Sequence, residues 1–167
     1  EKIDSLLKWN AEGWALHIDK LKINNGDFKN IKESTTPYND FFDGRNIDFA
    51  AINGTFSNVI VNKDTLTTSV ELKTKERSGF EVKSMVAEAK LTPTEMTFDK
   101  LEIQTNNSII RDYFSMKFED FSDMSSFITK VKMQARFEDA EIDSEDIAFF
   151  APAAKTWNKK IKVSGLA

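Results

Sequence analysis

The chain contains no cysteine. This absence excludes disulfide bonds, thiol nucleophiles and metal sites built on thiolates. Histidine occurs once, at His17, and a single histidine cannot supply a catalytic zinc site that uses two or three of them. His17 falls on the polar side of an alternating segment and has no recognisable serine and aspartate partners. We therefore expect a surface side chain and no catalytic triad.

Charge of one sign and long apolar runs are also scarce. The net charge is −4, and lysine and glutamate are interleaved, so no basic stripe of the kind that binds phosphate backbones is present. We expect no nucleic acid among the partners. No run reaches the roughly 18 apolar residues that cross a bilayer as a helix. The glycines of "NGTFSN" and "ERSGFE" match no phosphate-binding loop, and turns explain them.

Carboxylates are the remaining candidates for chemistry. They crowd the C-terminal third of the chain, at Glu119, Asp120, Asp123, Glu138, Asp139, Glu141, Asp143, Glu145 and Asp146. Glycosidases use two such groups in a defined cleft, and no spacing in a sequence shows a cleft. The calcium-loop pattern is absent, and turns, strand exteriors and helix starts account for most of these acids. We predict no catalytic residue, no metal, no cofactor and no enzymatic activity.

Phenylalanine is abundant, with fourteen residues against three prolines and six glycines. It occurs mostly in segments that alternate apolar and polar residues, which is typical of half-buried strands. The clearest alternation runs over 131–137. Several such segments are ten or more residues long, compared with a usual strand of about five to six. Asn-Gly pairs predict turns at 24–27 and around Gly54.

The apolar side of the alternation switches within single segments. Phe80 and Val82 lie on one parity of the alternation, whereas Met85, Ala87, Ala89 and Leu91 lie on the other, so the switch falls near Ser84. A second switch falls at 99–100. A β-bulge inserts one residue, bends the strand and produces such a switch, although a helix would also bring residues four apart together. Because strand-like segments dominate, we predict a mainly β fold. Its long, bent antiparallel strands form a curved or folded-over sheet, shaped as a groove.

Two segments near the C-terminal end predict short helices. The first is 122–128, which begins with serine and an acidic residue. The second is "DSEDIAFFAPAAKTWNKK", where Asp143 or Ser144 provides the N-cap and lysines suit the far end. Pro152 interrupts this second segment. We expect two short helices or a kink, with proline at the start of the second helix.

The apolar parity of the strands has two interpretations. It is either core, or one face of a folded sheet that stays uncovered and forms a groove for acyl chains. The candidate residues lining such a groove are Leu16, Ile18, Val70, Leu72, Phe80, Val82, Leu101, Ile103, Met116, Phe118, Val131, Met133 and Phe137. The sequence leaves open which strand face lines a cavity, because burial by protein and burial by lipid produce the same pattern.

Residues 144–165 carry a pattern that resembles large bacterial envelope proteins of the AsmA and TamB type, particularly those of Bacteroidetes. Ser144, Asp146, Ile147, Phe150 and Pro152 match a Ser-x-Asp-Ile-x-x-Phe-x-Pro pattern, and the following strand ends in glycine. The segment "LKTKERSGF" resembles the turn that precedes it in those proteins. The likeness extends from about residue 14 to residue 165.

The resemblance implies that residues 1–167 are a single β-rich internal segment of a larger, repeat-containing periplasmic protein. An inner-membrane anchor in the full-length protein would lie outside this segment. The implied role is non-enzymatic: phospholipid transport or outer-membrane assembly and homeostasis, with phospholipid or acyl chains and outer-membrane assembly proteins as partners. The alternative is a structural or protein-binding β-domain whose apolar face is fully buried.

Overall fold

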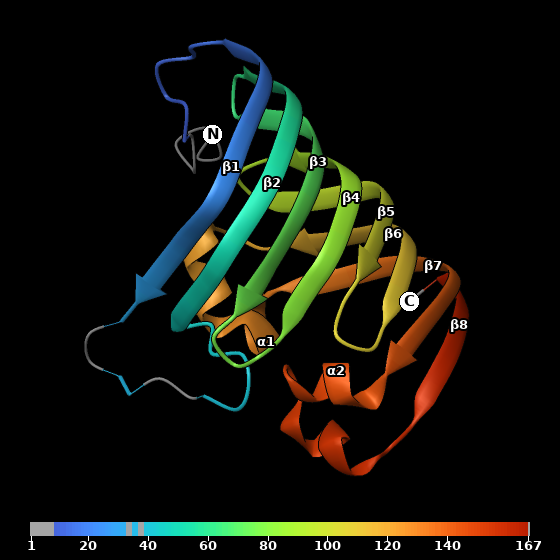
Figure 1. The fold of residues 1–167 in the computed structure, drawn as a ribbon. Helices are drawn as coiled ribbons and strands as arrows, with labels where there is room; N and C mark the ends of the chain where they lie inside the picture. Colours follow the sequence, from blue (N-terminus) through green and yellow to red (C-terminus); the bar gives the residue numbers. More distant parts are fainter. Residues whose placement is uncertain (1–8, 33–34, 37–38, 167) are drawn as a thin grey trace.

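The chain forms one antiparallel sheet of eight strands, and each strand pairs with its neighbours in sequence (Figure 1). The structure, a computed structural model, describes residues 9–32, 35–36 and 39–166. The strands are β1 (Leu16–Ile31), β2 (Asn46–Asn62), β3 (Thr65–Glu76), β4 (Glu81–Leu91), β5 (Glu95–Gln104), β6 (Ile109–Lys117), β7 (Lys132–Asp143) and β8 (Lys160–Leu166). The mainly β prediction is confirmed, and β1 and β2, with 16 and 17 residues, are as long as expected.

The parity switches correspond to β-bulges, as predicted. Between β3 and β4 the register shifts after Leu72 and Met85, because β4 has Lys83 and Ser84 where β3 has only Lys73. The switch at 99–100 is a register shift between β5 and β6, and Lys100 there has a φ of 50°. Residues 81–91 therefore form one bent strand, and 77–80 connect it to β3.

The bulges of several strands line up across the sheet. Positive φ angles occur at Asn58 in β2, Lys100 in β5, Asp112 in β6 and Asp139 in β7. Strand pairing places the last three next to one another, because Asp112 lies opposite Leu101 and Phe137. Bulges strengthen the local twist and bend the strand. Figure 1 shows the strands curving, so that the sheet folds over into a trough.

The buried core lies on the inside of the bend. Val70, Ala87 and Leu101 come from three neighbouring strands and are 3–5% exposed. Side chains on the inner side of a bent sheet converge, which buries them without a second sheet. The half-buried residues that pack around this cluster are Phe56, Leu72, Met85, Ala89, Phe98, Ile103, Ile110 and Phe114.

The predicted turns at the Asn-Gly pairs are wrong. Residues 24–27 lie within β1, where Asn25 has a φ of 50° and its backbone N–H donates to Asn53 Oδ1 at 3.0 Å. Gly54 lies within β2. An Asn-Gly pair reaches the left-handed region needed by a turn, but a bulge uses the same backbone conformation. Both pairs lie within continuing strands, and only the first contains a left-handed residue, because the positive φ beside the second pair falls on Ala51.

The helical predictions are confirmed. The first segment contains η1 (Phe121–Ser126) and α1 (Phe127–Lys130), and the second contains α2 (Ser144–Ala148) and η2 (Pro152–Thr156). Asp143 is the N-cap of α2, because its Oδ1 accepts from the Glu145 N–H at 2.9 Å. Pro152 begins η2, where its missing N–H costs no helical hydrogen bond.

Candidate functional site

The bend divides the sheet into two arms. A row of apolar residues crosses the arm that ends at the hairpin turns after β2 and β4. Directly opposed residues of antiparallel strands share a face, so the strand register places the members side by side. We call it the lip row, and its members are Leu16, Val61, Leu66, Leu91, Met96, Met116 and Met133. The inner face is thus apolar almost to the ends of the strands.

Burial is uneven along the lip row. Val61 is only 3% exposed, whereas Leu16 at one end and Met133 at the other are 40% and 53% exposed. The other members are half-buried. A closed core would bury such side chains almost completely. Apolar surface on the inner face therefore remains accessible to solvent along the lip row.

A second inner row lies on the other side of the bend. Its members are Ile23, Gly54, Leu72, Met85, Ile103 and Ile110, which the register also places side by side. They are all half-buried. Gly54 is closely packed, since a Cβ there would lie 3.1 Å from both the Glu71 carbonyl oxygen and Leu72 Cδ1. The two rows face the inside of the trough from its two arms.

The structure brings most of the predicted lining residues onto the strands of the inner face. Val70, Leu72, Leu101 and Ile103 meet in the core cluster. Leu16, Met116 and Met133 belong to the lip row, and Ile18 lies opposite the buried Val59. Val82 is buried opposite Thr74, and Phe137 lies opposite Asp112 at the bend.

Phe80, Phe118 and Val131 lie outside the strands and are not brought into these rows. Phe118 is buried against Phe121, with 5.1 Å between the ring centroids, and Val131 is buried just before β7. Phe80 packs instead against an aromatic group at the α2 end. Alternation in the sequence continues past the ends of strands, so it does not show where pairing stops.

The aromatic group at the α2 end consists of Phe42, Phe80, Phe149 and Phe150. Phe80 lies 5.5 Å from Phe149 and 5.1 Å from Phe150, and Phe42 lies 5.4 Å from Phe150 between centroids. The Phe42 N–H also donates to the Phe149 carbonyl at 2.7 Å. These contacts join the β1–β2 connection, the β3–β4 turn and α2. Phe42 and Phe149 could not be predicted as members of this group, because they lie outside the alternating segments.

A polar pocket of about 440 Å³ opens where β6 ends and β7 begins. It is lined by Lys117, Phe118, Glu119, Asp123, Thr129, Lys130 and Lys132. Asp123 is buried and accepts a hydrogen bond from Lys130 Nζ at 2.8 Å and another from the Glu119 N–H at 2.9 Å. The Lys130 contact, helped by that N–H, lowers the pKa of Asp123, and Asp123 in turn raises the pKa of Lys130.

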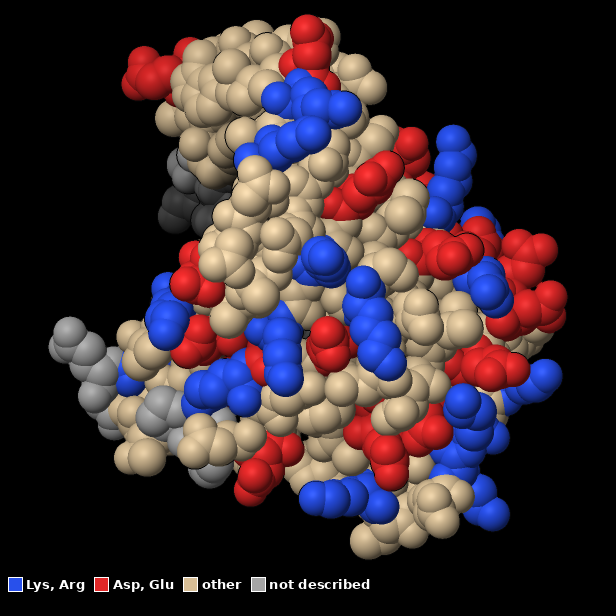
Figure 2. Space-filling model, viewed as in Figure 1, with Lys and Arg blue, Asp and Glu red and all other residues tan. Residues whose placement is uncertain are grey.

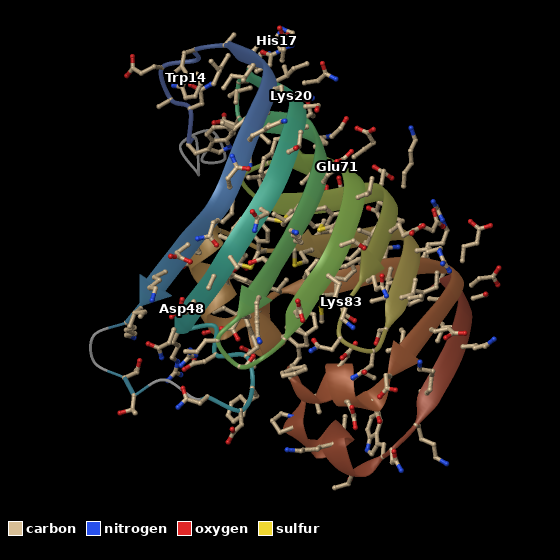
Figure 3. The ribbon with its side chains drawn as sticks, viewed as in Figure 1. Trp14, His17, Lys20, Asp48, Glu71 and Lys83 are labelled. Atoms are coloured by element: carbon tan, nitrogen blue, oxygen red, sulfur yellow. The ribbon has the colours of Figure 1, made fainter. Side chains whose placement is uncertain are left out.

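The outer face of the sheet is charged, as the polar parity predicts. Figure 2 shows lysine and acidic side chains spread together over β1 to β4, without a field of one sign. Lys22, Lys73 and Lys83 border a shallow depression of about 400 Å³ on these strands, whose lining also includes Ile23, Gly54, Leu72 and Met85 of the second inner row. His17 is exposed near the start of β1, as predicted, and its Nε2 lies 3.6 Å from Asp19 (Figure 3).

The described residues contain neither a cluster of metal ligands nor a helix that could cross a membrane. No group of three histidine, cysteine, aspartate or glutamate side chains lies close enough to hold a metal ion within 9–32, 35–36 and 39–166. No helix in that part of the chain is long and apolar enough to cross a membrane. Comparison with protein-family models, with curated proteins and with solved structures gives no match.

Proposed function

We propose that this chain is a non-enzymatic periplasmic segment whose trough binds the acyl chains of phospholipids, as part of lipid transport or outer-membrane assembly. The lip row carries this proposal. It places apolar side chains next to one another from β1 to β7 and leaves Leu16 and Met133 exposed at its two ends. Exposed apolar surface on a concave face is typical of a binding site.

The energetics of acyl chains suit such a surface. Each buried CH₂ contributes about 0.8 kcal/mol, so partial burial along one row stabilises a bound chain substantially. The methionines of the row, Met96, Met116 and Met133, have flexible and polarizable side chains that adapt to chains of different shape. The charged outer face keeps the opposite side of the sheet in contact with water.

The place of this segment in the cell is proposed from the AsmA and TamB resemblance at residues 144–165. Under this proposal the full-length protein is anchored in the inner membrane and carries further β-repeats through the periplasm. Its partners are phospholipid or acyl chains and outer-membrane assembly proteins. The flanking sequence tests this part directly, because an N-terminal membrane helix and repeated β-segments are expected there.

The competing function is a structural or protein-binding β-domain. The burial of Val70, Ala87 and Leu101 at the bend favours it, because protein alone covers these side chains. The two functions differ in what covers the lip row. Delipidated protein is therefore titrated with a fluorescent phospholipid analogue. We expect saturable, stoichiometric uptake, whereas no uptake at high micromolar lipid would leave the structural function.

A further inference from the structure

A loop that carries two tryptophans lies at the Leu16 end of the lip row. It comprises residues 9–15, directly before β1, and we call it the tryptophan loop. The rings of Trp9 and Trp14 pack edge to face with 6.4 Å between their centroids, and the two residues are 38% and 47% exposed. Figure 3 shows Trp14 at the end of the sheet where β1 begins. Since only Ala15 separates Trp14 from Leu16, the loop extends the exposed apolar surface of the lip row beyond its last member.

The polar groups of the tryptophan loop are bound by the protein itself. Asn10 is buried, and its side chain donates to the carbonyls of Trp14 and Lys63, both at 2.7 Å, and accepts from the Trp14 N–H at 3.1 Å. The Asn10 N–H donates to Asp64 Oδ1, and the Trp9 indole N–H donates to the Asp64 carbonyl, both at 3.0 Å. These bonds attach the loop to the turn between β2 and β3. They also need no water, which is the condition for placing backbone in an apolar medium.

Apolar side chains are exposed on both faces of the sheet beside this loop. Leu16 lies on the inner face, whereas Ile60 is also exposed and faces outward, because its neighbour Val61 belongs to the lip row. Farther along β1 the outer face is charged, for example at Lys20 (Figure 3). A partner that covered one face alone would leave either Leu16 or Ile60 in water. Immersion of the end of the sheet in a lipid surface covers both.

We propose that the tryptophan loop contacts the surface of a phospholipid bilayer, and that acyl chains pass from there onto the lip row. Tryptophan concentrates at the boundary between lipid tails and water, because its ring is apolar and its N–H is polar. The loop and its attached turn contain Glu12 and Asp64 but only one basic residue, Lys63, so attraction to anionic lipids does not drive the contact. A neutral bilayer is the expected target. This inference rests on the proposed lipid-binding function and adds the place where lipid enters.

The test uses vesicles of dioleoyl phosphatidylcholine, with and without bromine on the acyl chains. Bromine quenches the fluorescence of an indole ring that reaches those chains. Trp157, which is 53% exposed but follows η2 near the C-terminal end, provides the matched control. Trp157→Phe protein, which fluoresces only from the loop, should be quenched. Protein with both Trp9→Phe and Trp14→Phe, which fluoresces only from Trp157, should not be quenched. Equal quenching of the two proteins would overturn the placement of the contact.

A second measurement gives the contribution of one ring to vesicle binding. Trp14→Gln should weaken co-sedimentation with the vesicles by about tenfold, the effect expected when about a third of an indole is withdrawn from an apolar environment. Trp157→Gln should leave the affinity unchanged. Equal affinities of folded Trp14→Gln protein and wild type would contradict the proposal. The quenching comparison does not depend on the folding of Trp14→Gln, because it uses only aromatic replacements.

Two negative outcomes have different meanings. If wild-type protein takes up the fluorescent phospholipid analogue but does not bind the vesicles, the bilayer contact is wrong, the acyl groove stands, and the exposed rings are left for a protein partner. If wild-type protein neither binds the vesicles nor takes up the analogue, the proposed function is wrong, and the bilayer contact fails with it.

Discussion

Met116 and Met133 stand directly opposite each other on β6 and β7, yet the structure covers them differently. Met116 is half-buried by its neighbours, whereas 53% of the Met133 surface is exposed. Both belong to the same apolar row, which continues through the half-buried Met96 and Leu91 towards β1. The exposed end of that row is the surface on which the lipid proposal depends.

Replacing Met133 by aspartate should abolish lipid uptake and leave the fold intact. An exposed side chain contributes little to the free energy of unfolding, so we expect a change within about 1 kcal/mol. A carboxylate in the path of an acyl chain would have to be desolvated, which opposes binding. Uptake of a fluorescent phospholipid and urea unfolding measure the two effects on the same preparation.

Val86→Asp is the control for this substitution. Val86 is 52% exposed, but it lies opposite Glu71 and Glu102 on the charged outer face. It should keep full lipid uptake. Unchanged uptake in folded Met133→Asp protein would contradict the placement of the acyl chain. Val70→Asp, in contrast, puts a charge among buried neighbours and should cost several kcal/mol of stability or prevent folding.

Lys100 tests the line of bulges at which the sheet bends. Its φ of 50° is a conformation that glycine adopts freely and β-branched residues avoid. Lys100→Gly should leave the stability unchanged or raise it by up to about 1 kcal/mol, whereas Lys100→Val should lower it by about 1–2 kcal/mol. Urea unfolding of both variants checks the order. Equal stability of the two would show that the bulge does not impose a left-handed residue in solution.

Gly44 tests the contact between the β1–β2 connection and η1. A Cβ at this position would lie 2.8 Å from the Met124 carbonyl oxygen, which is backbone and cannot rotate away. Gly44→Ala should therefore separate the two segments and cost about 1–3 kcal/mol, as other overpacked sites do. Hydrogen exchange should increase locally in residues 43–46 and 121–124. Gly13→Ala is no control, since its φ of 67° adds backbone strain, so wild-type protein serves as the reference.

The sequence predicted the bends of single strands but not their alignment. The bulges at Ser84 and Lys100 are visible as parity switches because each one reverses the face of the residues that follow. Whether Lys100 lies beside Asp112 and Asp139 depends on the register between strands, which alternation within one strand does not contain. The trough is a property of that alignment.

Alternation within one strand also does not show where the strand begins or which loop packs against it, and this explains which residues were misplaced. Phe80 fits the alternation of β4 but comes before it, and it packs with Phe149 and Phe150 instead. Phe42 joins this group through a connection without periodicity. The helix cap at Asp143 and the break at Pro152 were predictable, because capping and proline geometry act within a few residues of the chain.

The Asp123–Lys130 pair predicts how stability depends on pH. The pKa of Asp123 is lowered by the Lys130 hydrogen bond, so the pair stabilises the fold above the unfolded pKa of about 3.9. This contribution is lost as the pH falls through the lower folded pKa. The pKa of Lys130 is raised by Asp123, so the contribution persists up to about pH 10.4 and is lost as the pH rises through the higher folded pKa.

Lys130→Gln should therefore be less stable than wild type between about pH 4 and pH 10, and the difference should shrink at lower and at higher pH. Urea unfolding across this range measures the difference directly. Lys90→Gln, at an exposed lysine that forms no ion pair in the described ranges, should show a small difference that does not vary with pH. If the difference in the free energy of unfolding between Lys130→Gln and wild type also does not vary with pH, the contact with Asp123 contributes packing and no electrostatic stabilisation. The ion pair would then not stabilise the pocket beside β6 and β7.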